Sequence, residues 1–114
     1  MSRNYTVKWT DTAEHDLDSI IGFIAEDSLE EAVKILEKMR KKAAGLHTLP
    51  ERGRIVPELK EQEITLYREI VLAPWRMIYR IAGQTVYVLA VFDARRNLED
   101  ILLERFVGCR EADP

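Results

Sequence analysis

Arginines are the residues of this chain whose type and spacing best suit chemistry. Six of them are candidate site residues, and they lie on the predicted strands, directly after one strand, or in the loop before the strands. They are Arg54, Arg68, Arg76, Arg80, Arg95 and Arg96. A guanidinium group presents a rigid fork of N–H donors that binds a phosphate or a carboxylate through two parallel hydrogen bonds. Arg76 and Arg80 are separated by an even number of residues on one predicted strand, so their side chains should leave the same face. Several such forks near one end of a sheet would form an anion clamp.

Two other interpretations of the same arginines are open. Acidic residues lie close to them in sequence and are candidate salt-bridge partners: Glu58, Glu63, Glu69, Asp93 and Glu99. Protein recognition is the third interpretation, because Tyr67, Trp75 and Arg76 belong to the residue types that are enriched among interface anchors. Spacing alone does not distinguish anion binding, internal salt bridges and protein recognition.

No other catalytic or metal centre is indicated by the sequence. The chain has two histidines, His15 and His47, and one cysteine, Cys109. No group of His, Cys, Asp and Glu has the spacing of a metal site. A Gly-rich phosphate loop and a Gly-x-Ser-x-Gly nucleophile turn are also absent from the sequence. We therefore expect neither a metal nor a cofactor.

Charged clusters on the predicted helices are interpreted as solvated surface. The acidic clusters are the pairs Asp16/Asp18 and Glu30/Glu31, and the basic cluster is Lys38, Arg40, Lys41 and Lys42. The basic cluster falls at the end of a predicted helix, where cations complement the negative end of the helix dipole. The net charge is −3, and only residues 51–96 lean positive, with eight Lys/Arg against six Asp/Glu. Broad nucleic-acid binding is therefore disfavoured, whereas local anion recognition is compatible with these charges.

Length and composition indicate one globular domain. The chain has 114 residues, of which 46% are hydrophobic and 32% charged, so an ordinary hydrophobic core is expected. The single cysteine excludes an intramolecular disulfide and fits a reducing cytosol. No apolar run reaches the length of a membrane span, so we expect a cytoplasmic protein without membrane contact. We predict a single domain over residues 1–108 and a disordered tail over residues 109–114.

Two predicted strands joined by a tight turn form the structural centre of the chain. Trp75–Ile81 alternates apolar with mostly polar residues, which is typical of a half-buried strand. Gly83 and Gln84 supply the turn, in which glycine accepts a positive φ at no steric cost. Thr85–Phe92 is almost entirely apolar and β-branched or aromatic, so this strand should lie inside the sheet. A preceding strand over Ile64–Ala73 would complete a three-stranded meander.

The N-terminal half is expected to supply an edge strand and a helical hairpin. Tyr5–Thr10 has one polar face, so it should lie near the edge of the sheet. A capping box of Asp11 with Glu14 predicts where the first helix begins, and Ser28 with Glu31 predicts the second. The short link between them makes the helices antiparallel, so that their apolar stripes can cover a sheet.

The remaining segments complete the predicted fold. Residues 47–62 form a loop that is longer than most connections, which favours a functional role. A last helix is predicted from Asn97, a good N-cap residue. The predicted fold is therefore α+β with the order β-α-α-β-β-β-α, a helical hairpin packed on a small, mostly antiparallel four-stranded sheet, and a C-terminal helix.

Five segments, in this order along the chain, resemble the RelE/ParE toxin superfamily. They are GR-x-VPEL (Gly53–Leu59), LYRE (Leu66–Glu69), WRMIYRI (Trp75–Ile81), TVYVLAV (Thr85–Val91) and DARRNLEDILLERF (Asp93–Phe106). The opening segment TDTAEHDLDSIIGFIAE (Thr10–Glu26) is also similar to the first helix of that family. This resemblance implies a small toxin of a type II toxin–antitoxin, or plasmid stabilisation, module, neutralised by a cognate antitoxin. An amphipathic antitoxin helix would dock along the helical hairpin, and an extended segment would add to a strand edge.

The superfamily has two branches, which differ in their targets. RelE-like members are ribosome-dependent endonucleases that cleave mRNA without a metal, and the resemblance would then give Arg76 and Arg95 or Arg96 a catalytic role. ParE-like members share the fold without the nuclease residues and are thought to act on DNA gyrase. Glu99 stands where the RelE-like pattern places a tyrosine, and its charge would repel a phosphodiester. The resemblance therefore favours a ParE-like gyrase toxin over two alternatives, an mRNA endonuclease and an inactive binding module of the same fold.

Overall fold

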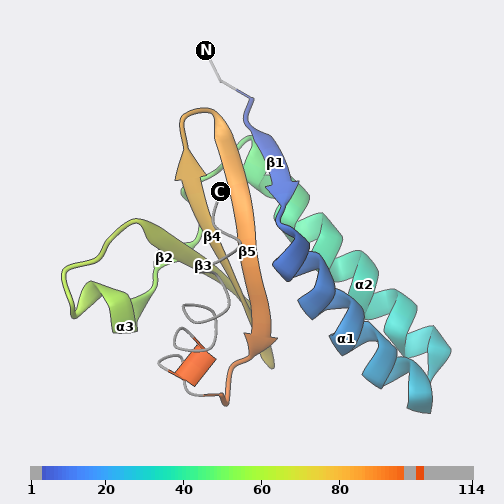
Figure 1. Ribbon diagram of the computed structural model, residues 1–114. Coiled ribbons are helices and arrows are strands. Elements are labelled where there is room, and N and C mark those ends of the chain that lie inside the picture. The colour runs from blue at the N-terminus through green and yellow to red at the C-terminus, as the bar shows by residue number, and fades with distance from the viewer. Residues whose placement is uncertain (1–3, 97–99, 102–114) are drawn as a thin grey trace.

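The computed structural model describes residues 4–96 and 100–101 of the 114-residue chain. Its elements are β1 (Thr6–Trp9), α1 (Asp11–Asp27), α2 (Leu29–Ala44), the short 3₁₀ helix η1 (Gly45–His47), β2 (Arg54–Ile55), α3 (Pro57–Lys60), β3 (Tyr67–Leu72), β4 (Trp75–Ala82) and β5 (Thr85–Asp93) (Figure 1). The predicted C-terminal helix, apart from Asp100 and Ile101, and the predicted tail 109–114 lie outside the described residues. No helix in the described part of the chain is both long and apolar enough to cross a membrane.

The sheet has five strands in the order β1-β5-β4-β3-β2, and not the four that the sequence predicts. β1 runs parallel to β5, and the other neighbours are antiparallel. The additional strand lies inside the predicted loop, where Arg54 pairs with Glu69 and Ile55 with Arg68. Two residues are too few to show an alternating pattern, so this strand depends on its long-range pairing with β3. The edge position of β1 and the interior position of β5 are confirmed.

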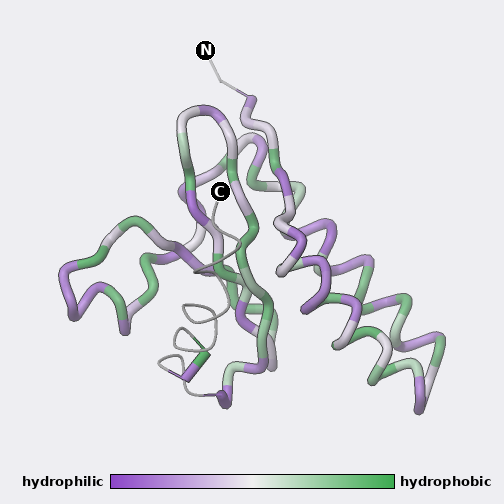
Figure 2. Tube along the Cα trace, in the orientation of Figure 1, coloured by the Kyte–Doolittle hydropathy of each residue, from purple (hydrophilic) through white to green (hydrophobic). Residues whose placement is uncertain are grey.

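The helices α1 and α2 form an antiparallel hairpin that covers one face of the sheet (Figure 1). Figure 2 shows apolar residues concentrated along β5, which lies next to α1. The core between the hairpin and the sheet is formed by Ala13, Leu17, Met39, Ala43, Met77, Val88 and Val91. Burial of the Leu, Met and Val side chains in this core stabilises the fold by about 1.5–3 kcal/mol each. The predicted helical hairpin is therefore confirmed.

The opposite face of the sheet has a second, smaller core. It contains Val56, Ile78, Ala90, Phe92 and Ile101, with Leu59 of α3 and Tyr67 packed against it. Consequently all four residues from Arg76 to Tyr79 are buried. The prediction that this strand is half-buried was wrong at its centre, because α3 and Ile101 cover the face that the alternation pattern leaves to solvent.

The ends of the helices agree with the capping patterns with one correction. The N-cap of α1 is Thr10, whose Oγ1 accepts a hydrogen bond from the amide of Ala13 at 3.1 Å. Its hydroxyl also donates to the carbonyl of Val88 on β5, at 3.2 Å, and this tertiary contact places the cap one residue before Asp11. Ser28 caps α2 through the amide of Glu31, as predicted. α2 ends at Ala44, and Gly45 is its C-cap.

Two further details of the sequence prediction are corrected by packing. β3 begins at Tyr67, and Ile64 and Leu66 are exposed residues outside it. Asp16, which was expected on a solvated helix surface, accepts a hydrogen bond from the amide of Val91 at 3.0 Å. This contact lies beside a register shift, where Ile78 pairs with Ala90 but Tyr79 pairs with Val88. The Gly83-Gln84 turn is confirmed, with φ 60° at Gly83 and Ala82 paired with Thr85.

Candidate functional site

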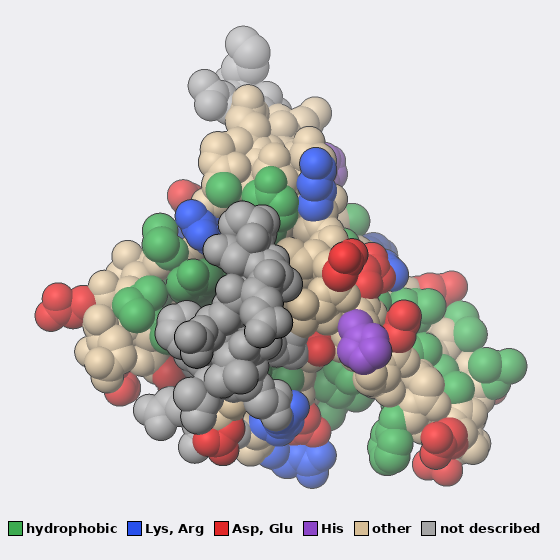
Figure 3. All heavy atoms as spheres, in the orientation of Figure 1, with side chains coloured by type: hydrophobic (Ala, Val, Ile, Leu, Met, Phe, Trp, Pro, Cys, Tyr) green, Lys and Arg blue, Asp and Glu red, His purple; other side chains and the backbone are tan. Residues whose placement is uncertain are grey.

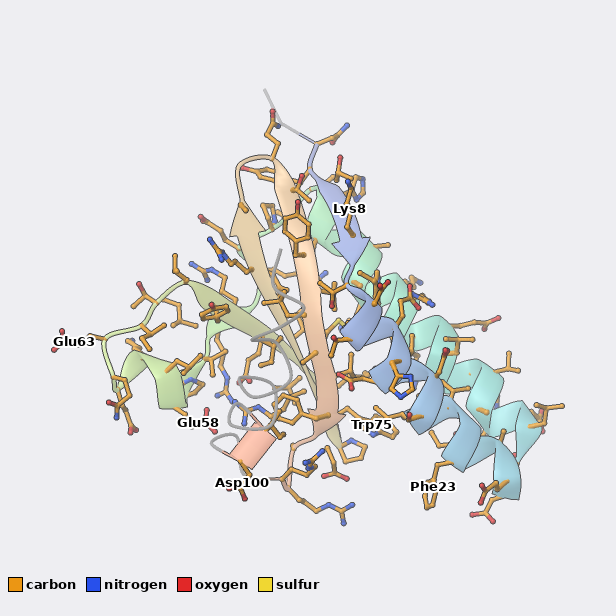
Figure 4. The ribbon with its side chains drawn as sticks, viewed as in Figure 1. Lys8, Phe23, Glu58, Glu63, Trp75 and Asp100 are labelled. Carbon is orange, nitrogen blue, oxygen red and sulfur yellow. The ribbon has the colours of Figure 1, made fainter. Side chains whose placement is uncertain are left out.

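Arg76 is the arginine that the fold places at the centre of the sheet. Its side chain is almost fully buried, with 8% of its surface exposed. Nε donates to Oε1 of Glu69 at 2.6 Å, and the two terminal nitrogens donate to the carboxylate of Glu58 at 2.9 and 2.8 Å. The guanidinium also lies over the ring of Phe92, 5.5 Å from its centroid. In Figure 4 the labelled Glu58 lies on α3, on the side of the sheet away from the helical hairpin. The anion fork of Arg76 is thus filled by carboxylates of the chain itself.

Glu69 joins Arg76 to a second arginine. Its side chain is fully buried, and its other oxygen, Oε2, accepts from Nε of Arg54 at 2.5 Å. The side chain of Arg54 is 62% exposed, so this end of the cluster reaches the surface. Two guanidinium groups and two carboxylates therefore form a charge-balanced cluster that links β2, α3, β3 and β4. A buried carboxylate requires such partners, because desolvation of an unpaired charge costs several kcal/mol.

The electrostatics of the cluster favour its charged forms. The hydrogen bonds that Arg76 donates lower the pKa of Glu58 below its usual value, against a smaller opposing effect of burial. The same hydrogen bonds with Glu58 raise the pKa of Arg76, with burial opposing and Glu69 adding to the rise. Glu58 and Arg76 are therefore both ionised at neutral pH.

The other predicted arginines do not converge on this cluster. Arg68 donates to the carbonyl oxygens of Gly53 and Glu51 at 2.8 and 3.3 Å, which fastens the loop after α2 to β3. Arg80 is exposed near the far end of β4, paired in register with Tyr67 and Tyr87. Arg95 and Arg96 are exposed after β5, beside the other end of β4, because Trp75 pairs with Asp93. Arg95 lies near Trp75, and Arg80 lies five residues further along β4. At about 3.3 Å per residue, Trp75 and Arg80 are more than 15 Å apart.

Arg95 is paired with the last residue of β5. Its Nε and one terminal nitrogen donate to the two oxygens of Asp93 at 2.9 and 2.7 Å, and its backbone amide donates to Asp93 at 2.8 Å. These hydrogen bonds lower the pKa of Asp93 to about 2. The salt-bridge interpretation is thus realised at Arg54, Arg76 and Arg95, with Glu58, Glu69 and Asp93 as the partners.

A contact between Gly53 and Tyr79 holds the segment that leads into β2 and Arg54. The sequence patterns did not predict this contact. The amide of Gly53 donates to the hydroxyl oxygen of Tyr79 at 2.9 Å, and burial raises the pKa of this phenol. A Cβ atom added at Gly53 would lie 2.5 Å from the carbonyl oxygen of Glu69 and 2.7 Å from the Tyr79 hydroxyl. Only glycine fits this close approach. A glycine in a loop is visible in the sequence, but the sequence does not show which side chain packs against it.

An apolar surface lies at the free end of the helical hairpin. Phe23 near the end of α1 is 72% exposed, and Leu29 and Val33 at the start of α2 are 71% and 46% exposed. Figure 3 shows hydrophobic side chains on the outside of the hairpin, and Figure 4 shows Phe23 pointing away from it. Leu29 and Val33 are apolar residues of the amphipathic helix α2, yet the sheet does not bury them. We call Phe23, Leu29 and Val33 the hairpin patch.

Within the described residues, no group of three or more His, Cys, Asp and Glu side chains is arranged to hold a metal ion. Arg54, Arg76, Glu58 and Glu69 are instead paired with one another, and the exposed residues include Arg80, Arg95 and several large apolar side chains. Such an arrangement suits recognition of another macromolecule, since arginine and large apolar residues are frequent anchors of protein interfaces.

Comparison with known proteins identifies the family. Residues 7–98 match the family described as ParE toxin of the type II toxin–antitoxin system parDE. Among solved structures, the chain is similar to one described as the chromosomal ParDE toxin–antitoxin system from P. aeruginosa, with a TM-score of 0.63, 23% identity, and coverage of 78% of this chain and 95% of that one. It is also similar to one described as the toxin–antitoxin complex RelBE2 from Mycobacterium tuberculosis, with a TM-score of 0.59, 26% identity, and coverage of 80% and 92%.

No curated protein sequence matches the chain. The family match spans β1 to the residues after β5, and therefore includes the hairpin, the sheet and the arginine cluster. The resemblance to the RelE/ParE superfamily noted in the sequence is confirmed, and the chain belongs to the ParE toxin family of type II toxin–antitoxin systems.

Proposed function

We propose that this toxin acts on DNA gyrase by binding it, and that its exposed arginines contact that target. The observation that supports this proposal is the closed fork of Arg76, whose donors are taken by Glu58 and Glu69. A ribonuclease that stabilises a phosphate transition state needs this kind of group open to the substrate. Arg80, Arg95 and Arg96 are exposed, with Arg95 oriented by Asp93, and could reach a partner surface. Arg54 and Arg68 border the same sheet and would support the contact.

A gyrase supercoiling assay tests this target directly. Purified toxin should inhibit ATP-dependent supercoiling of relaxed plasmid DNA, and added antitoxin should restore it. The variant Arg80→Glu should inhibit less, because it reverses a charge at an exposed position without touching the buried cluster. Lys60→Glu, which alters an exposed cation on α3, is the matched control. Normal supercoiling in the presence of excess toxin would contradict the proposal.

The second candidate is a RelE-like mRNA endonuclease, favoured by the structural similarity to RelBE2. In that case Arg76 would have to leave Glu58 before binding RNA, with Arg95 or Arg96 beside it. Primer extension on mRNA from translating ribosomes distinguishes the two candidates. Cleavage by the unaltered toxin that is lost in Arg95→Ala would establish the nuclease. Inactivity in both assays would leave an inactive binding module.

We also propose that the cognate antitoxin covers the hairpin patch. The patch consists of exposed aromatic and aliphatic side chains, which mark interaction sites when they gather on a soluble surface. An amphipathic helix laid along the hairpin would bury them. Co-expression with the antitoxin should raise the yield of soluble toxin, and strong expression of the toxin alone should arrest growth. Unaffected growth under strong expression would contradict the assignment of toxicity to this chain.

A further inference from the structure

A hollow of about 760 Å³ opens beside the C-terminal end of α2, away from the arginine cluster. Its lining is basic with an apolar floor and consists of Lys38, Lys41, Lys42, Ala44, Gly45, His47, Arg52 and Leu72. We call it the basic hollow. Figure 1 shows this end of α2 next to β1, at the opposite end of the hairpin from the hairpin patch.

The fold brings these cations together from two segments, α2 and the loop after η1. Lys38, Lys41 and Lys42 follow the spacing that places residues on one side of a helix. Arg52 comes from the loop after η1, and one of its terminal nitrogens lies only 3.1 Å from the position that a Cβ of Gly45 would take. The absence of a side chain at Gly45 therefore lets the guanidinium rest against the end of α2.

His47 adds a polar group to the same wall. Its Nδ1 lies 2.9 Å from the carbonyl oxygen of Ala44 and, since a carbonyl only accepts, Nδ1 carries the hydrogen. Nε2 is then left for an outside partner. The side chain is consequently held in one orientation at the rim of the hollow.

The cations of the basic hollow differ from Arg40 and Arg76, whose guanidinium groups are taken up by carboxylates. Arg40 is held by Glu14 in a bidentate pair, and Arg76 by two carboxylates. Lys38, Lys41, Lys42 and Arg52, in contrast, make no ion pair with a carboxylate within residues 4–96 and 100–101. Four like charges gathered around a concave surface attract an anionic partner, because a cleft lined by one sign of charge concentrates its field.

We propose that the basic hollow binds a short acidic segment of a partner protein, with carboxylates on the lysines and an apolar side chain against Leu72. An apolar floor is a better match for a peptide segment with an apolar side chain than for a phosphate backbone. Exposed Glu37 and Glu51 adjoin the lining residues in sequence and would repel a longer polyanion. The inference does not depend on gyrase being the target, because it concerns a surface that does not include Arg80 on β4 or Arg95 and Arg96 after β5.

Fluorescence anisotropy with a labelled peptide, Glu-Glu-Leu-Glu-Glu-Leu-Glu-Glu, tests the proposal on the purified full chain. The peptide should bind the unaltered protein, and the affinity should fall with added salt. The double variant Lys41→Glu/Lys42→Glu should bind about tenfold more weakly or worse, from the loss of two charge contacts. The matched control is Lys34→Glu/Lys60→Glu, which makes the same change in net charge at exposed lysines outside the hollow, and its affinity should change much less.

Three results would overturn the proposal. The first is the absence of peptide binding at low salt, and the second is an equal loss of affinity in both double variants, which would show a non-specific charge effect. The third is tighter binding of a single-stranded RNA oligonucleotide with the same dependence on Lys41 and Lys42, which would make the hollow a nucleic-acid site. If Lys41→Glu/Lys42→Glu does not fold by circular dichroism, Lys41→Gln/Lys42→Gln replaces it, and unchanged peptide affinity in that variant would equally contradict the proposal.

Discussion

The guanidinium of Arg76 holds the carboxylate of Glu58 in two parallel hydrogen bonds of 2.9 and 2.8 Å and thereby ties α3 to the centre of the sheet. The same guanidinium lies over the ring of Phe92 and also donates a hydrogen bond to the fully buried Glu69. This relationship explains why an arginine at the position expected to grip a ligand serves the fold instead. It also defines which substitutions should affect stability and which should affect binding.

Replacing Arg76 should destabilise the protein strongly. In Arg76→Ala, Glu69 stays buried with Arg54 as its only charged partner among the described residues, and removing one member of a buried ion pair costs about 3–5 kcal/mol. Urea denaturation followed by circular dichroism should show this loss in the free energy of unfolding. Arg76→Lys keeps the charge but loses the fork, so its free energy of unfolding should lie between those of the unaltered protein and Arg76→Ala. A loss below about 1 kcal/mol would show that the cluster is not a stabilising element.

Acid should weaken the attachment of α3. The pKa of Glu58 is lowered in the folded state by the hydrogen bonds from Arg76, so its contribution to stability is fully present above its ordinary, unfolded value of 4.5 and is lost as the pH falls through the lower folded value. The urea midpoint of the unaltered protein should therefore decline below about pH 4.5. The decline should be shallower in Glu58→Gln, which has no proton to bind there. Identical pH profiles for the two proteins would contradict the assignment.

Substitution of Gly53 should be much more costly than substitution of a glycine with free space around it. The methyl of Gly53→Ala would meet the Glu69 carbonyl oxygen at 2.5 Å and the Tyr79 hydroxyl at 2.7 Å, and forcing an atom into packed structure costs about 1–3 kcal/mol. Gly22→Ala is the matched control, because nothing lies within 4 Å of the added atom. Gly22 lies inside α1, where alanine is favoured by up to about 1 kcal/mol. Thermal unfolding should move in opposite directions for the two variants.

The hairpin patch should matter for antitoxin binding and little for folding. Phe23→Ser and Leu29→Ser remove side chains that are already more than 70% exposed, so the free energy of unfolding should change by no more than about 0.5 kcal/mol. Calorimetric titration with the cognate antitoxin should show a loss of about 2 kcal/mol if these side chains are interface anchors. Leu49→Ser, at an exposed leucine in the loop after η1, is the control and should leave the affinity unchanged.

An unchanged antitoxin affinity in both patch variants would place the antitoxin elsewhere. The strand edges would then be the next surfaces to test, beginning with β1, which is an edge strand of the described sheet and pairs with β5.

Local patterns in the sequence were sufficient for most of the secondary structure. Alternation of apolar residues, capping at Ser28, and the Gly83-Gln84 turn each depend on neighbours within a few positions, so they can be read before the chain folds. The edge strand, the helical hairpin and the interior position of β5 follow from these patterns, since an apolar stripe has to be buried against another element. The set of acidic residues that could pair with the arginines is likewise apparent from their proximity along the chain.

Which of those pairs form, and which strands they join, depends on contacts between distant segments. Glu69 meets Arg76 and Arg54 because β3 lies between β4 and β2, and β2 is too short to leave a pattern of its own. The cap at Thr10 and the bond from Val91 to Asp16 likewise depend on how α1 lies against β5. Sequence periodicity is a property of one element, whereas charge pairing and burial on a second face require the register between elements. For this reason the sequence indicated six arginines of one kind, whereas the fold gave them different roles. Arg54 and Arg76 join the carboxylate cluster, Arg68 binds carbonyl groups of the loop after α2, and the exposed Arg80, Arg95 and Arg96 lie away from the cluster.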